Sequence, residues 1–398
     1  MAVLFLAHRS PFPPDRGDKI RAYNILKYLA ARTPVHLLAF ADDKRDLDSA
    51  GLASLTASCK IVWRGKSRVV AMLEALASGK PASLTAFDSA EMRAAVADVL
   101  GRGDIDTIYV FSGQMAQYLP EGTRARVIMD FCDMDSLKFA DYAKTATGPM
   151  RWLMQREADR LFAFERQVAG RVEASLFVSA AEEELFRART RAAKVRVVEN
   201  GIDTDFFGPA ASFDAVDERG PLIVFTGQMD YRPNTEAVAW FARDVLPAVR
   251  AAHPQARFAI VGRNPGEAVR ALAGEAVIVT GEVADVRGWL AAAACVVAPL
   301  KIARGVQNKV LEAMAMARPV VASDAAAEGI DHAGTIRCAH DAAAFAGAVI
   351  DLLDHAEKGD ALGAKARARV RERYGWDARL APLDALLGWP PAPARDAA

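Results

Sequence analysis

The chain has 398 residues, of which 52% are hydrophobic and 25% charged, and its 50 basic residues balance its 50 acidic ones. This composition excludes a disordered or fibrous chain, and the lack of a basic excess argues against nucleic acid as a partner. A single hydrophobic core stops growing at roughly 250 to 300 residues, so the length predicts two domains.

The first apolar run, residues 2–7, is long enough for one strand and is not preceded by basic residues, so it does not resemble an export signal. No apolar stretch reaches the roughly 20 residues that span a bilayer. We therefore expect a cytoplasmic protein, for which a peripheral position at the inner face of the membrane stays open.

Further runs rich in Val, Ile, Leu and Phe follow, separated by segments in which apolar residues recur with helical spacing. Buried parallel strands have this continuous apolar character, and helices between them cover both faces of a sheet. In the first half of the chain the pattern predicts strands at 2–7, 35–40, 60–63, 107–111, 126–130 and 175–178.

A turn-rich and polar stretch at 200–221 interrupts this pattern, which then restarts. We predict an N-terminal Rossmann-like domain over 1–205 and a second one over 206–375. Strands of the second domain are expected at 222–226, 258–261, 277–280, 296–299 and 320–323. A helix over 376–389 is expected to pack back on the N-terminal domain, and the Pro/Ala-rich tail 390–398 to be disordered.

The predicted fold class is thus α/β, with two doubly wound domains facing across a cleft and ligands bound beyond the carboxyl ends of the strands. The loop after the first strand runs to Gly17, where a helix is predicted to begin. Gly17 lets a donor phosphate or an acceptor approach the backbone, and three following side chains supply polar contacts on the acceptor side: Asp18, Lys19 and Arg21. Alternatively, the prolines of this loop only stiffen a surface turn and Asp18 caps the helix.

The segment 299–321 contains the strongest candidate site and reads as a strand end, a loop, a helix that begins near Gly305, and the next strand. At about 100° per residue the polar residues of this helix fall within one narrow arc, and apolar residues cover the rest. The arc holds Gly305, Asn308, Lys309 and Glu312. Burying the two charges without partners would be costly, so the arc faces a cleft, or else Lys309 and Glu312 pair on a surface helix.

A cleft-facing arc suits a nucleotide diphosphate. Gly305 lets backbone amides at the helix N-terminus approach an anion, and Lys309 adds a full positive charge. Glu312, one turn further on, can accept hydrogen bonds from vicinal hydroxyls such as a ribose diol.

The same segment resembles the signature of the retaining glycosyltransferases of family 4, in which two glutamates separated by seven residues precede Ala-Met-Ala and Pro-Val-Val. Glu312 matches the second glutamate, and Arg304 stands where the first would be. Arg304 is expected to join Lys309 in holding the pyrophosphate, because arginine suits bidentate phosphate contacts. The resemblance covers almost the whole chain and is closer to a bacterial branch linked to exosortase (PEP-CTERM) exopolysaccharide loci, through segments 8–19, 198–203 and 225–234.

The resemblance implies the GT-B fold and a transferase that acts on a nucleotide sugar with retention, without cofactor or metal. It places donor contacts at Gly227 and at Arg232, the nearest cation after that glycine. It also places the backbone around Val283 beside the nucleobase. Arg263, after the next strand, is a second cation candidate or a plain surface charge.

Asp133 and Asp135 form an Asp-x-Asp pair, the metal-binding mark of the other glycosyltransferase fold, GT-A. Because two doubly wound halves are predicted, we interpret both as strand-end residues on the acceptor side or as helix caps, and expect no metal. The segment 150–172, with Arg151 and Trp152, is expected to be a long surface helix, and contact with a membrane that carries a lipid-linked acceptor is the alternative.

The predicted function is transfer of a sugar from a nucleotide diphosphate to a hydroxyl of a glycan or polyprenyl-linked acceptor in exopolysaccharide or other cell-surface glycan synthesis. Lys309, Glu312 and Arg304 are the predicted catalytic residues, and the departing diphosphate is stabilised by the two cations and by amides near Gly305. Two alternatives stay open: a nucleotide-sugar epimerase on the same fold, and a non-catalytic protein that binds a nucleotide sugar.

Overall fold

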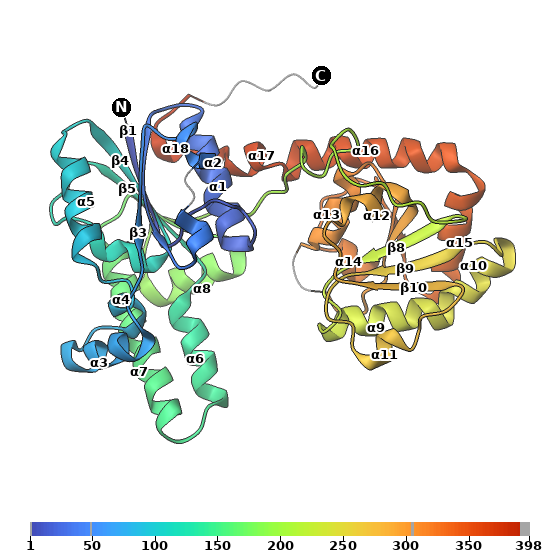
Figure 1. Cartoon of the computed structure of the whole chain (residues 1–398), viewed down its shortest axis with the longest axis horizontal. Helices are drawn as coiled ribbons and strands as arrows, with labels where there is room; N and C mark the ends of the chain where they lie inside the picture. Colours follow the sequence, from blue (N-terminus) through green and yellow to red (C-terminus); the bar gives the residue numbers. More distant parts are fainter. Residues whose placement is uncertain (1, 48–49, 304–305, 391–398) are drawn as a thin grey trace. The chain divides into compact units, whose positions relative to one another are not determined.

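The computed structural model describes residues 2–47, 50–303 and 306–390, and the chain divides into two compact units. The first unit comprises the chain up to Asn200 together with the chain from Arg379 onward, and the second comprises Gly201–Ala378. Figure 1 shows that each unit is an α/β domain built on one sheet. The predicted boundaries, after 205 and after 375, lie close to these two divisions.

The first unit contains a seven-stranded sheet in the order β3-β2-β1-β4-β5-β6-β7, and every described pairing is parallel. All residues of β1 and β2 are buried, which shows that both faces of the sheet are covered at its centre. The strands are β1 (Ala2–Ala7), β2 (Val35–Ala41), β3 (Ser58–Trp63), β4 (Ile105–Phe111), β5 (Arg126–Cys132), β6 (Ala174–Phe177) and β7 (Val195–Val197).

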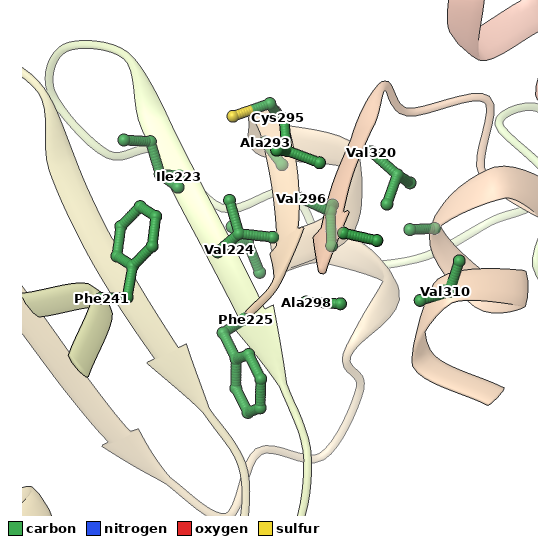
Figure 2. Close-up of a cluster of buried hydrophobic side chains, with 14 of the residues drawn as sticks. Ile223, Val224, Phe225, Phe241, Ala293, Cys295, Val296, Ala298, Val310 and Val320 are labelled. Carbon is green, nitrogen blue, oxygen red and sulfur yellow. The ribbon is translucent and has the colours of Figure 1, made fainter. Parts of the chain in front are cut away.

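The second unit contains a six-stranded parallel sheet in the order β10-β9-β8-β11-β12-β13. Its core joins Phe225 of β8 and Val296 of β11 to Val310 of a covering helix, as Figure 2 shows. The strands are β8 (Leu222–Thr226), β9 (Arg257–Val261), β10 (Val277–Gly281), β11 (Ala293–Ala298), β12 (Val320–Ser323) and β13 (Arg337–Ala339).

Helices connect the strands in both units. Those of the first unit are α1 (Gly17–Ala30), α2 (Ala50–Ala53), α3 (Arg68–Ser78), α4 (Ala82–Thr85), α5 (Ala90–Gly101), α6 (Asp135–Thr145), α7 (Gly148–Ala169), α8 (Ala180–Thr190) and α18 (Pro382–Leu387), with 3₁₀ turns at Lys44–Leu47 and Gly113–Tyr118. Those of the second are α9 (Arg232–Trp240), α10 (Leu246–Ala252), α11 (Glu267–Arg270), α12 (Arg287–Ala292), α13 (Asn308–Ala315), α14 (Asp324–Ala327), α15 (Ala342–Asp354) and α16 (Ala356–Tyr374), with a π-helical turn at Phe241–Val245. Helix α17 (Trp376–Leu380) spans the division between the units. No helix among the described residues has the length and apolar character to cross a bilayer.

The strand order reverses once in each sheet, between β1 and β4 and between β8 and β11. Doubly wound sheets bind ligands outside the carboxyl ends of the strands at this point. In the second unit, Gly227 directly follows β8, and the loop that follows β11 leads into α13. A ligand site is therefore expected at these two segments.

The predicted strands are confirmed to within a few residues, but β7 and β13, of three residues each, were not predicted. The prediction that a helix begins near Gly305 is wrong, because α13 begins at Asn308. Gln307 is extended, with φ −91° and ψ 99°, and its carbonyl accepts the N–H of Val310 at 2.9 Å. Gly305 itself, like Arg304, lies outside the described residues.

The predicted C-terminal helix over 376–389 is divided into α17 and α18. Helix α18 packs on the first unit, where the hydroxyl of Tyr28 donates to Asp384 at 2.8 Å and Arg126 donates to the carbonyl of Leu386 at 2.9 Å. From residue 391 onward, the predicted tail lies outside the described residues.

Candidate active site

Helix α13 presents three polar side chains after the carboxyl end of β11. Asn308 is exposed, whereas Lys309 and Glu312 are half-buried. Val310 and Leu311 are fully buried, because α13 packs on β11 and β12, and Figure 2 shows Val310 in this core. This packing fixes the direction in which the polar side of the helix faces.

The ammonium group of Lys309 is held by residues of β8 and α9. Its Nζ donates a hydrogen bond to Oδ1 of Asn234 at 2.6 Å and lies 4.1 Å from the centroid of the Phe225 ring, a cation–π contact. Asn234 is buried, and its Nδ2 donates to the carbonyl of Gln228 at 2.8 Å, which turns Oδ1 toward the lysine. The segment that follows β8 and the segment that follows β11 therefore meet at Lys309, where the strand order reverses.

Two strand ends beside Lys309 have no room for a side chain. A Cβ atom at Gly227 would lie 2.8 Å from Nδ2 of Asn234 and 3.0 Å from Nζ of Lys309. A Cβ atom at Gly262, after β9, would lie 1.7 Å from the carbonyl oxygen of Gly227. Glycine is thus required at 227 for the lysine and the asparagine to approach the backbone, and at 262 for the ends of β8 and β9 to approach each other.

The two charges of α13 have no salt bridge with any residue in the described part of the chain. Burial lowers the pKa of Lys309 to about 8, and the attraction of Glu312 only partly opposes this shift. Burial also raises the pKa of Glu312 to about 7, again against the attraction of Lys309. Both pKa shifts favour the neutral forms, as expected when a buried charge lacks a nearby counter-charge.

The other predicted donor contacts divide into two groups. Arg263 reaches the same strand end, where its Nη2 donates to Oε1 of Gln228 at 3.2 Å. Arg232 does not, since its side chain is 87% exposed and forms a surface ion pair with Glu236 at 2.7 Å. Val283, after β10, is half-buried against the core of the second unit.

The first unit places its predicted polar residues of segment 17–21 at the start of α1, but internal partners occupy their charges. Lys19 is 3% exposed and donates to Asp46 at 2.6 Å. Arg21 is 2% exposed and donates to Oδ2 of Asp130 through Nε at 3.1 Å and Nη2 at 2.9 Å. Asp18 pairs with Arg9 at 2.8 Å. Gly17 begins α1, and a Cβ atom there would meet nothing within 4 Å.

Residues 220–355, which make up most of the second unit, match the family model for glycosyl transferases group 1. This segment is therefore similar to the group 1 glycosyl transferases. A comparison of the whole chain with curated proteins gives no match.

Solved structures show the fold of the whole chain. HepE of Anabaena in complex with UDP is 17% identical, with a TM-score of 0.59 over 98% of this chain and 100% of that one. Sucrose-phosphate synthase of Thermosynechococcus elongatus is 19% identical, with a TM-score of 0.59 over 98% of each chain. WaaG, a glycosyltransferase involved in lipopolysaccharide biosynthesis, is 15% identical, with a TM-score of 0.57 over 97% of this chain and 100% of that one. The chain therefore has the GT-B fold of two Rossmann-like domains.

The Asp-x-Asp pair lies outside residues 220–355, after β5 in the first unit. Asp133 is exposed, whereas Asp135 accepts a hydrogen bond from Gln114 at 3.0 Å and pairs with Lys138 at 3.4 Å. Within the described ranges, no group of three or more His, Cys, Asp or Glu side chains could hold a metal ion.

Sequence reasoning missed Asn234, the residue that accepts a hydrogen bond from Lys309. It lies 75 positions before the lysine, so no local spacing connects the two. The available signal was Asn234 itself, a polar residue in the first turn of a helix that closely follows the glycine at the end of β8. Such a residue is placed to contact whatever lies beyond that strand end.

Proposed function

We propose that this protein is a glycosyltransferase whose second unit binds a nucleotide-diphosphate sugar, from which the enzyme transfers the sugar to a hydroxyl acceptor. The observation that supports this most strongly is the buried ammonium group of Lys309, which faces Asn234 and Gly227 without a carboxylate partner among the described residues. A diphosphate would supply the missing negative charge. HepE, which shares the fold, was solved with UDP and with UDP-glucose, and we propose UDP as the diphosphate that this chain binds.

Each residue has a separate role in this proposal. Lys309 contacts the diphosphate, and Asn234 positions its ammonium group. Arg263 is a second cation at the same strand end, and Glu312 accepts hydrogen bonds from a hydroxyl pair of the ribose or the sugar. The backbone around Val283 contacts the nucleobase. Arg304, Gly305 and Asn308 are proposed to complete the diphosphate contacts.

The bond between the anomeric carbon and the diphosphate oxygen breaks, and a bond from that carbon to the acceptor oxygen forms. The electron pair of the broken bond stays on the diphosphate, where the positive charge of Lys309 stabilises it. The proton of the acceptor hydroxyl passes to an oxygen of the departing phosphate. Attack from the face that the diphosphate leaves gives retention, and neither a protein nucleophile nor a cofactor or metal takes part in this proposal.

The proposed acceptor is a growing glycan or a polyprenyl-linked saccharide of exopolysaccharide synthesis, in the cytoplasm or at the inner face of the membrane. The proposal assigns Gly17, Asp18, Asp133 and Asp135 to the acceptor side. Lys19 and Arg21 instead join α1 to Asp46 and to Asp130 of β5 through their buried ion pairs.

The experiment is a panel of nucleotide sugars, assayed first by thermal shift and then for release of free nucleotide with and without lipid-linked acceptors. A donor that binds the folded chain raises its melting temperature. Acceptor-dependent release of nucleotide supports the transferase, whereas conversion of the donor without acceptor indicates an epimerase. Binding without any turnover indicates a non-catalytic protein, and the absence of any thermal shift would contradict the site itself.

A further inference from the structure

Helix α3 of the first unit has its apolar face turned outward. Ala71 and Ala75 are 2% and 0% exposed, whereas Val69 and Leu73 are 69% and 62% exposed. Helices of soluble domains normally bury their large apolar side chains and expose polar ones. Here the small residues face the core and the large ones face outward.

Specific contacts fix this orientation. The hydroxyl of Thr85 donates to the carbonyl of Ala71 at 2.6 Å, and Nη2 of Arg156, on α7, donates to the carbonyl of Ala75 at 2.6 Å. The helix also has defined ends, since Ser67 caps its N-terminus through Val70 and Gly79 ends it with φ 72°. Turning the large side chains inward would break both contacts to the carbonyls.

The exposed apolar residues form one continuous band, which we call the α3 stripe: Val69, Val70, Leu73 and Leu76. Val70 and Leu76 are each 45% exposed. The positions 69, 73 and 76 follow the spacing of one helical face, so their side chains lie side by side. Contiguous exposed apolar surface of this kind marks an interaction site.

The charges around the α3 stripe are positive. Glu74, the acidic residue of the helix, is paired with Lys66 at 2.7 Å. Arg68 at the first position and Lys80 just beyond the last have no carboxylate partner in the part of the chain that the structure describes. The stripe therefore has an unpaired cation at each end.

We propose that the α3 stripe docks on an anionic lipid bilayer, with its apolar side chains in the interfacial region and Arg68 and Lys80 at the lipid phosphates. An apolar face bordered by cations matches such a surface, because both the hydrophobic and the electrostatic attraction act in the same direction. A second copy of the chain fits less well, since pairing two stripes would bring like charges together. The proposal is independent of the donor site and concerns a helix other than α7, where Trp152 is also 61% exposed.

The test is sedimentation of the full chain with vesicles of phosphatidylcholine, with and without phosphatidylglycerol. We expect binding that depends on phosphatidylglycerol, and a loss of roughly tenfold or more in the double variant Val69→Glu with Leu73→Glu. Arg68→Gln with Lys80→Gln should reduce the preference for phosphatidylglycerol. Leu47→Glu is the matched control, because Leu47 is 47% exposed and lies outside α3, in the 3₁₀ turn Lys44–Leu47.

The exposed positions of the stripe leave folding intact, which thermal unfolding of each variant checks. Unchanged vesicle binding in the Val69→Glu, Leu73→Glu variant would overturn the proposal. An equal loss of vesicle binding in Leu47→Glu would also overturn it. The same holds if the chain forms a dimer in solution that the Val69→Glu, Leu73→Glu variant dissociates without any change in vesicle binding. UDP binding, measured in parallel, should be the same in all variants, so a failure here does not bear on the donor site.

Discussion

The two units treat buried charge in opposite ways at the ends of their strands. In the first, burial disfavours the charge of Arg21, but the neighbouring Asp130 more than compensates and raises the pKa of the arginine. In the second, burial lowers the pKa of Lys309 and raises that of Glu312, because neither forms a salt bridge among the described residues. A buried charge is costly unless it is paired. The first arrangement therefore serves the fold, and the second is the one that we propose as the donor site.

The comparison also separates residues that look alike in the sequence. Lys19, Arg21 and Lys309 are all basic residues near a glycine and a helix start. What distinguishes a structural cation from one available to a diphosphate is the residue that it contacts. For each of the three, that residue is distant in the sequence.

The largest effect is expected from breaking a pair in the first unit. Asp130→Asn leaves the guanidinium of Arg21 buried without a counter-charge, which should lower the free energy of unfolding by about 3–5 kcal/mol. Denaturant unfolding measures this. Asp98→Asn is the control, because Asp98 is 73% exposed in its pair with Arg102, and it should change the stability by less than about 1 kcal/mol. Equal effects of the two substitutions would show that the buried pair is not structural.

Removing the unpaired cation of the second unit should affect turnover. Lys309→Ala should reduce nucleotide-sugar turnover by about 10²–10³-fold, or about 3–4 kcal/mol of transition-state stabilisation. Arg232→Ala is the matched control, because Arg232 belongs to the same unit but forms a surface pair with Glu236. Near-normal turnover in Lys309→Ala, with the chain folded, would remove Lys309 from the proposed site.

Glu312→Gln should stabilise the protein without ligand while it weakens turnover. The folded-state pKa of Glu312 is about 7 against an ordinary value of 4.5, so the folded chain retains this proton to higher pH than the unfolded chain. The carboxyl group therefore costs stability progressively as the pH rises from about 4.5 through 7. At pH 8 the variant should unfold with a free energy higher by about 1–3 kcal/mol, and at pH 4.5 the difference should vanish. A destabilised variant at pH 8 would contradict the account.

Asn234→Asp would convert the second unit to the arrangement of the first. The new carboxylate beside Lys309 should raise the pKa of the lysine and compete with a diphosphate, weakening UDP binding by about tenfold, or about 1.4 kcal/mol. Isothermal titration calorimetry measures this. Gln255→Glu places a similar charge at an exposed position just before β9, at the end of that strand opposite Gly262, and serves as the comparison. Tighter UDP binding in Asn234→Asp would be inconsistent with a diphosphate at Lys309.

Most of the fold could be predicted because buried parallel strands appear as continuous apolar runs, as in β1 and β8. The three-residue strands β7 and β13 are too short to give such a signal. The start of α13 was predicted too early, because no breaker marks the extended backbone of Gln307.

The candidate site was predictable only in part. Helical spacing placed Lys309 and Glu312 on one face, but Asn234 lies 75 residues from its lysine partner and Asp130 lies 109 residues from Arg21. Contacts over such separations depend on strand order, which local patterns do not specify. The same limit applies to α3, whose periodicity shows an apolar face but not that this face turns outward.

The most direct test of the central claim is the pH dependence of UDP binding to the wild type and to Lys309→Arg, measured by calorimetry from pH 7.5 to 9. The wild type should lose about eightfold in affinity over this range, because a lysine with a pKa of about 8 loses the charge that the diphosphate requires. Lys309→Arg should show no such loss, since arginine stays charged. Parallel profiles for the two proteins would contradict the claim that Lys309 is the unpaired cation awaiting a diphosphate.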